Sequence, residues 1–171
     1  MGLQATATYA DCDLSAQLST APVGGRQTRQ TRQVRLAALP SAVPWARRVL
    51  RHMIGEWQLE SIADTAALLV SELVTNAVDA SAASASRGHG KLPMIGLTIR
   101  LTAASLVLEV SDTSPLRPVR QEADSAADHG RGLVLVDALA DAWGDRAADD
   151  GKVVWCEVAI PARPAALGSV Q

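Results

Sequence analysis

The stretch from Leu68 to Ala80 constrains the fold most, because it is an apolar helical run interrupted by three polar side chains. At about 100° per residue, Glu72, Asn76 and Asp79 fall within roughly 60° of one another on a helix surface. A carboxylate beside a packed apolar face is costly to desolvate, so it needs a partner such as an ion, a donor or a substrate. The pattern predicts a core helix with a site along its edge, beside an apolar stripe of Ile62, Ala66, Leu69, Leu73, Ala77 and Ala80.

Glu and Asn four residues apart also occur by chance on ordinary helices, so this spacing alone does not identify a site. Two further signals follow it in the chain. A strand ends at Asp112, and Gly130-Arg131-Gly132-Leu133 opens another helix. Three signals in series are much rarer than one, and together they favour a functional interpretation.

Length and composition fit one domain with a sizeable core. The chain has 171 residues, of which 48% are hydrophobic, and a formal net charge of −2. No run of Lys or Arg covers one face, so we expect no direct nucleic-acid partner and no membrane partner. Cys12 and Cys156 lie at opposite ends with no Cys/His cluster, which predicts no disulfide framework and no zinc site. Without a signal-peptide pattern or an apolar run of roughly 18 residues, we expect a soluble, cytoplasmic protein.

Periodicity predicts the order of the structural elements. Residues 1–32 lack periodicity and are rich in Thr, Ser, Gln, Ala and Gly, which predicts a disordered tail. Beyond it, alternating apolar residues predict strands, and apolar residues spaced by three and four predict helices. In chain order we expect a strand at 34–38, a helix from Ser41 to Trp57, the core helix from Ser61 to Ala80, a hairpin of 95–101 and 106–110, a helix from Gly130 to near Gly144, and a second hairpin of 143–147 and 154–160.

The order of these elements predicts an α/β (α+β) two-layer sandwich, in which a mainly antiparallel sheet is covered on one face by helices. It does not fit the repeated βαβ units of a doubly wound sheet. Residues 113–129 hold prolines and charged side chains with little apolar content, which is typical of a functional lid or a disordered connection. We therefore expect a domain at 33–161, flanked by the tail at 1–32 and a C-terminal tail at 162–171.

These pieces fit nucleotide chemistry if the two helices lie side by side on the sheet. A phosphate chain could then bind at the N-terminus of the second helix, where free N–H groups and the positive end of the helix dipole point outwards. The side-chain oxygen of Asn76 could join Mg²⁺, and Glu72 could take a proton from an attacking hydroxyl or water. Asp112 could accept an amino donor such as the exocyclic amine of adenine.

The glycine motif is weak when taken alone. The chain has no GxxxxGK[ST] motif, which excludes a P-loop, and Gly130-Arg131-Gly132 is too short to count as GxGxxG. A loop-to-helix junction that needs positive φ would explain it equally well. Its functional interpretation depends on the accompanying Glu72, Asn76 and Asp112.

The chain resembles the GHKL group of ATP-binding domains, which includes gyrase and the sensor histidine kinases. It is most similar to the small anti-sigma factor serine kinases and their actinobacterial relatives. Residues 72–77 resemble the N box, 112–115 the first glycine box, 130–133 the second, and 151–155 the closing hairpin of those relatives. The resemblance covers about residues 34–160. Ser114 and Leu116 stand where the wider pattern has glycines, and no phosphoacceptor-histidine pattern precedes the domain, so we expect no self-contained sensor kinase.

The resemblance implies the Bergerat ATP-binding fold with ATP and Mg²⁺ as cofactors. It implies that Asn76 binds Mg²⁺, that Glu72 is the catalytic base, that Asp112 holds adenine, and that residues 113–129 form the ATP lid. It also implies nucleotide contacts from Asp79, Ser114, Gly130, Arg131, Gly132 and Leu133.

Three functions stay open on the sequence alone. The first is a serine/threonine protein kinase that acts as an anti-sigma factor and phosphorylates an anti-sigma factor antagonist, with a sigma factor as a further partner and a homodimer as the common assembly of such kinases. The second is a nucleotide-gated protein-binding module without catalysis. The third is a plain interaction domain whose nucleotide site is vestigial.

Overall fold

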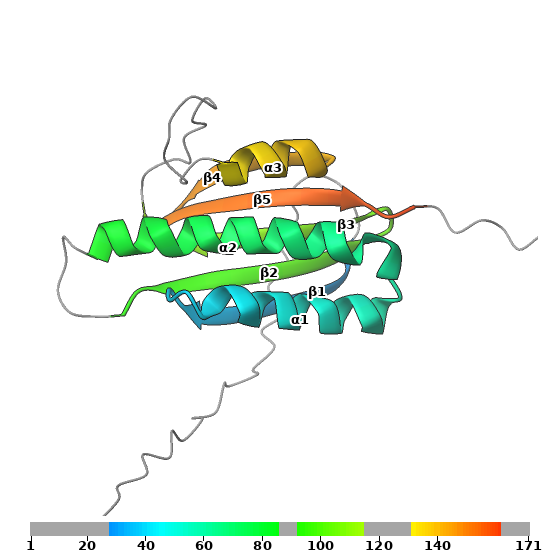
Figure 1. Cartoon of the computed structure of the whole chain (residues 1–171), viewed down its shortest axis with the longest axis horizontal. Helices are drawn as coiled ribbons and strands as arrows, with labels where there is room; N and C mark the ends of the chain where they lie inside the picture. Colours follow the sequence, from blue (N-terminus) through cyan, green and yellow to red (C-terminus); the bar gives the residue numbers. More distant parts are fainter. Residues whose placement is uncertain (1–27, 86–91, 115–130, 162–171) are drawn as a thin grey trace, which may run out of the picture.

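The computed structural model describes residues 28–85, 92–114 and 131–161 (Figure 1). Within these ranges the chain forms five strands, three α-helices and one short 3₁₀ turn. The predicted lid and both predicted tails lie largely outside the described residues. The elements are β1 (Thr28–Ala37), α1 (Ala42–Trp57), η1 (Glu60–Ile62), α2 (Ala63–Ala85), β2 (Met94–Thr102), β3 (Ser105–Asp112), α3 (Arg131–Leu139), β4 (Ala142–Ala148) and β5 (Gly151–Ala159).

The five strands form one antiparallel sheet in the order β1-β2-β3-β5-β4. Alternation along β2 buries Ile95, Leu97 and Ile99 on one face, because successive side chains of a strand point to opposite faces. Leu97 lies opposite Val110 of β3, so the apolar rows of neighbouring strands are aligned. The predicted two-layer α+β fold with an antiparallel sheet is confirmed.

The helices cover one face of this sheet, with α2 lying between α1 and α3 (Figure 1). α2 packs on β2, β3 and β5 and contacts both neighbouring helices. Its Leu69 and Leu73 are almost fully buried, and each contributes about 1.5–3 kcal/mol by leaving water. The run that we expected to be a core helix therefore occupies the centre of the helical layer.

Among the described residues, one helical stretch is long and apolar enough to cross a membrane. It runs from Glu60 to Ser84 and contains most of α2. Half of the 18-residue apolar window within that stretch is buried inside the protein. The core helix of a soluble protein meets the same criteria of length and composition, so they are weak support for a membrane span.

Several boundaries differ from the predicted ones, and three have an evident cause. β1 begins at Thr28, within the predicted tail, because pairing with β2 continues to Thr28 opposite Thr102 and does not depend on apolar alternation. α2 continues to Ala85, since the alanines after residue 80 favour helix. α3 ends at Leu139, before Gly144, because the N–H of Asp141 already donates to the Glu157 carbonyl of β5 at 2.9 Å.

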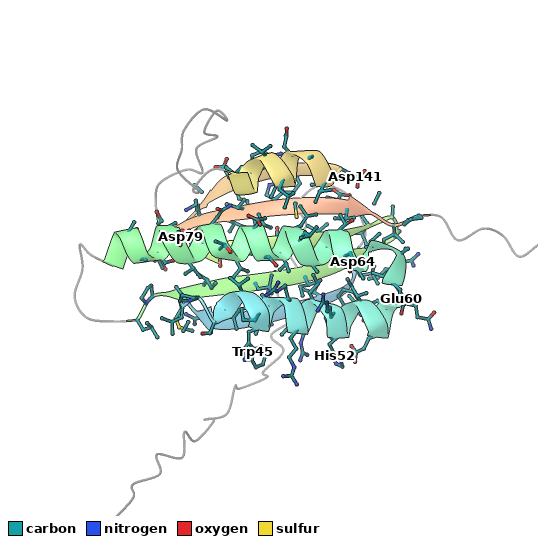
Figure 2. The ribbon with its side chains drawn as sticks, viewed as in Figure 1. Trp45, His52, Glu60, Asp64, Asp79 and Asp141 are labelled. Atoms are coloured by element: carbon teal, nitrogen blue, oxygen red, sulfur yellow. The ribbon has the colours of Figure 1, made fainter. Side chains whose placement is uncertain are left out.

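α1 turns its polar side away from the core. His52 and Trp45 point outwards from it in Figure 2, and Nε2 of His52 lies 3.3 Å from Oε1 of Glu56. Both side chains of this pair are more than half exposed. His52 is thus a surface residue.

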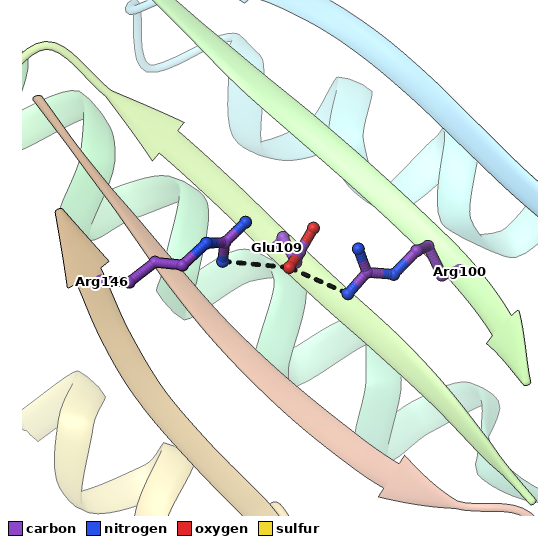
Figure 3. Close-up of polar contacts among 3 residues, drawn as sticks. All are labelled: Arg100, Glu109 and Arg146. Carbon is purple, nitrogen blue, oxygen red and sulfur yellow. Dashed lines mark hydrogen bonds and ion pairs between the residues drawn. The ribbon is translucent and has the colours of Figure 1, made fainter. Parts of the chain in front are cut away.

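The face of the sheet opposite the helices carries an ion cluster. Oε1 of Glu109 on β3 lies 2.9 Å from Nη2 of Arg100 on β2 and 3.1 Å from Nη1 of Arg146 on β4 (Figure 3). Glu109 is buried although α1, α2 and α3 all lie on the other face of the sheet. The two guanidinium groups compensate its charge and link three strands.

Candidate functional site

α2 carries the three predicted polar side chains, Glu72, Asn76 and Asp79, along one side of the helix. Glu72 and Asn76 are half-buried, whereas their neighbours Leu73 and Ala77 are buried in the core. Asp79 is exposed and lies toward the C-terminal end of α2 (Figure 2). Glu72 and Asn76 therefore share a partly desolvated environment that Asp79 does not.

Asn76 has an unsatisfied polar atom. Its Nδ2 is buried and has no hydrogen-bond partner among the described residues. An unpaired buried amide costs about 1–3 kcal/mol, so such an atom calls for a ligand or a functional explanation. A carboxamide offers an oxygen to a cation and N–H groups to a phosphate oxygen, and both suit a magnesium-bound phosphate chain.

Asp112, the last residue of β3, is held at one of its two oxygens. Oδ1 accepts hydrogen bonds from the backbone N–H of Ser114 at 2.8 Å and from Nζ of Lys152 at 2.9 Å. Oδ2 is buried and has no partner among the described residues. The carboxylate thus has a fixed orientation and one buried acceptor left for a donor from a ligand, which fits the amino group of a purine.

Lys152 is the site residue that the sequence analysis missed. It is buried, and its side chain is only 7% exposed. The signal was present, because alternation along β5 puts position 152 on the same face as Val154, Cys156 and Val158, where a lysine is not expected. The β3–β5 register places it directly opposite Asp112.

Gly151 allows the two strand ends to approach. Its φ is +146°, a conformation that residues with a side chain rarely adopt. A Cβ at this position would overlap the carbonyl oxygen of Asp112 and crowd Cα of Thr113, which it would meet at 2.8 Å. The glycine is therefore required by the geometry that sets Asp112 against Lys152.

α3 begins at Arg131, and Gly132 and Leu133 follow in its first turn. Leu133 is buried, and α3 packs against α2, so the two helices lie side by side as the nucleotide hypothesis requires (Figure 1). Ser114, two residues after Asp112, is also buried. Gly130 and the predicted lid, apart from residues 113 and 114, lie outside the described residues.

The donor set limits how a cation could be held. Among residues 28–85, 92–114 and 131–161, no group of three or more His, Cys, Asp or Glu side chains is placed to hold a metal. A Mg²⁺ ion at Asn76 would therefore take its remaining ligands from phosphate oxygens and water, which is its usual preference in nucleotide sites.

Comparison with known proteins agrees with this geometry. Residues 36–157 match the family described as histidine kinase-like ATPase domain, and they include both α2 and the Asp112–Lys152 pair. No curated protein matches the chain. Since the match covers most of the 171 residues, the chain belongs to the histidine kinase-like ATPase domain family, an assignment that supports ATP as its ligand.

Proposed function

We propose that this protein is a regulatory serine/threonine protein kinase that uses Mg-ATP and acts as an anti-sigma factor by phosphorylating an anti-sigma factor antagonist. The observation that carries the proposal is the pairing of Glu72 with Asn76. The two residues lie one helical turn apart on α2, and both are half-buried. The chain that carries them belongs to a family of ATPase domains. This spacing lets one side chain serve the metal and the other serve as a base.

The purine would bind at the strand end. Asp112 is oriented by Ser114 and Lys152, and its Oδ2 would accept one N–H of the adenine amino group. Hydrogen bonds to charged groups contribute about 1.5–3 kcal/mol, so this contact would supply much of the base selectivity.

The phosphate end would lie at α2 and α3. Asn76 would offer its carboxamide oxygen to Mg²⁺, and the free N–H groups in the first turn of α3 would face phosphate oxygens. Bound Mg-ATP would supply its γ-phosphoryl group, and ADP would leave as the bond between the γ-phosphorus and the bridging oxygen breaks. Glu72 would take the proton of the serine hydroxyl as that oxygen attacks, a role that typically accelerates a reaction by about 10²–10⁴-fold.

The partners of the proposed kinase follow from its class. The substrate would be a serine on the antagonist protein, and a sigma factor would be held by the kinase until the unmodified antagonist releases it. We further propose a homodimer in the cytoplasm, where ATP and sigma factors are found.

Labelled ATP tests this function. The protein is incubated with Mg-ATP and candidate antagonist proteins, and label on serine is measured for the wild type and for Glu72→Gln. We expect Glu72→Gln to bind ATP within about threefold of wild type and to lose at least roughly a hundredfold in transfer rate. Glu56→Gln, which changes an exposed carboxylate on α1, is the matched control and keeps both properties.

The outcomes separate the alternatives. Transfer that persists in Glu72→Gln contradicts the assignment of the base. Tight ATP binding without label on any antagonist favours the nucleotide-gated binding module. Absence of ATP binding in the wild type favours the interaction domain with a vestigial site.

A further inference from the structure

We infer that Lys152 is a positioning residue of the purine site: it occupies one oxygen of Asp112, so that the other is presented alone to a base that carries an exocyclic amino group. This inference rests on the proposed nucleotide function and deepens it. It assigns the base preference to a pair of residues on two strands, Asp112 on β3 and Lys152 on β5.

The first step is the cost of placing a lysine there. A buried ammonium group needs a compensating charge, because removing it from water costs several kcal/mol. Asp112 supplies that charge at 2.9 Å, and its side chain is 1% exposed. The pair faces the helical layer, on the side of the sheet where Val154 and Cys156 form the core. A methionine would fill such a position without that cost, so the charge itself calls for an explanation.

The second step is the difference between the two carboxylate oxygens of Asp112. A pair that served stability alone would be expected to satisfy both oxygens of Asp112, since unpaired buried acceptors are costly. Both described donors converge instead on Oδ1, and Oδ2 stays buried without a partner among the described residues. Ser114 and Lys152 thus fix which oxygen is free.

The third step is the ligand chemistry. A single carboxylate oxygen accepts an N–H and repels a carbonyl oxygen, so it favours the 6-amino group of adenine and disfavours a 6-oxo purine. If Lys152 is removed, the carboxylate can rotate and its charge is no longer compensated. The preference for the amino group should then weaken more than the binding of the rest of the nucleotide.

The experiment compares two nucleotides on two variants. Dissociation constants for Mg-ATP and for purine riboside 5′-triphosphate, which lacks the amino group, are measured by calorimetry on wild type, Lys152→Met and Lys152→Arg. Met keeps the length of the side chain without charge. Arg keeps the charge, and its guanidinium can donate to both oxygens of Asp112 at once, which fills Oδ2. Arg100→Met is the control, because it removes a cation from an ion pair on the opposite face of the same sheet.

We expect wild type and Arg100→Met to prefer ATP by roughly tenfold to a hundredfold, the value of one hydrogen bond to a charged group. Lys152→Met and Lys152→Arg should reduce this ratio to about threefold or less. Circular dichroism melting without nucleotide establishes that each variant is folded. If Lys152→Met does not fold, Lys152→Arg decides the question.

A folded Lys152 variant that keeps the wild-type ratio would overturn the inference. This includes a variant that loses affinity for both nucleotides equally, as it would if the residue were purely structural. Wild type that binds both nucleotides without preference contradicts the inference alone. Wild type that binds neither contradicts the proposed function itself.

Discussion

Lys152 and Asp112 are 40 residues apart in the chain, yet they face each other across β5 and β3 and form a buried ion pair of 2.9 Å. The antiparallel register brings them together, because the first residues of β5 pair with the last residues of β3. The pair is adjacent to Gly151, whose backbone conformation permits the close approach. The site lies where the end of β3 meets the start of β5, and it results from the sheet topology and from one turn residue, Gly151.

Gly151→Ala should destabilise the fold and weaken nucleotide binding. The new Cβ would overlap the Asp112 carbonyl oxygen at a φ of +146°, so we expect the free energy of unfolding to fall by roughly 2–4 kcal/mol. Urea unfolding measures it. Gly55→Ala in α1 is the matched control, since nothing lies within 4 Å of a Cβ added there, and it should raise stability by about 0.5–1 kcal/mol. Equal effects of the two substitutions would contradict the steric account.

Glu109→Gln should lower stability without changing nucleotide affinity. The substitution removes the charge that compensates Arg100 and Arg146, and we expect a loss of about 1.5–3 kcal/mol in thermal or urea unfolding. ATP affinity should stay within about twofold, because the cluster lies on the sheet face opposite the helices. Glu56→Gln disrupts an exposed pair and should change stability by less than about 0.5 kcal/mol. A change in ATP affinity in Glu109→Gln would mean that the two faces of the sheet are coupled.

Cys156 should be unreactive in the folded protein. Burial raises the pKa of this thiol from 9.0 to about 12, so almost no thiolate is present near neutral pH. In a Cys12→Ser background, we expect labelling by a thiol reagent at pH 8 to be at least roughly a hundredfold slower than in urea. The folded state also keeps this proton to higher pH than the unfolded chain does, so its contribution to stability should decrease as pH rises above about 9. Rapid labelling of the native protein would show that the core around β5 opens readily.

Asn76→Ala should reduce the dependence of ATP affinity on magnesium. Wild type should bind ATP more tightly with Mg²⁺ than with a chelator present, because Asn76 is the proposed protein ligand of the ion. We expect the alanine variant to lose roughly tenfold in Mg-ATP affinity and much less in the affinity for metal-free ATP. An equal loss under both conditions would assign Asn76 to the phosphate chain and not to the metal. Asp64→Ala, at an exposed position in the first turn of the same helix, is the control.

Much of the fold could be predicted from the sequence because its signals are periodic. Alternation identified β2 and β3, and a polar edge on an apolar run identified the face of α2 that carries Glu72 and Asn76. The start of β1 could not be predicted in the same way, since its first residues are held by pairing with β2 and carry no apolar pattern. The end of α3 depends on a hydrogen bond to β5, which is equally invisible in a local pattern.

Only part of the site could be predicted from the sequence, because only some of its residues lie where a local pattern points to them. The apolar alternation that ends at Asp112 is visible in the sequence, and a carboxylate at the end of a buried strand suggests a ligand site. Lys152 follows a turn glycine, where a lysine is ordinarily a surface residue. Alternation along β5 puts it on the core face, but only the register with β3 shows that it lies beside Asp112. The roles assigned to these residues stay predictions, and the experiments above test them one by one.

Calorimetric titration with Mg-ATP, carried out side by side on wild type and Asp112→Asn, tests the central claim most directly. Asn has the shape of Asp but would turn an N–H₂ toward the adenine amino group in place of Oδ2. We predict a saturable heat signal at one nucleotide per chain for wild type, and an affinity at least roughly tenfold weaker for Asp112→Asn. No heat with wild type, together with a melting temperature that Mg-ATP leaves unchanged, would contradict the account.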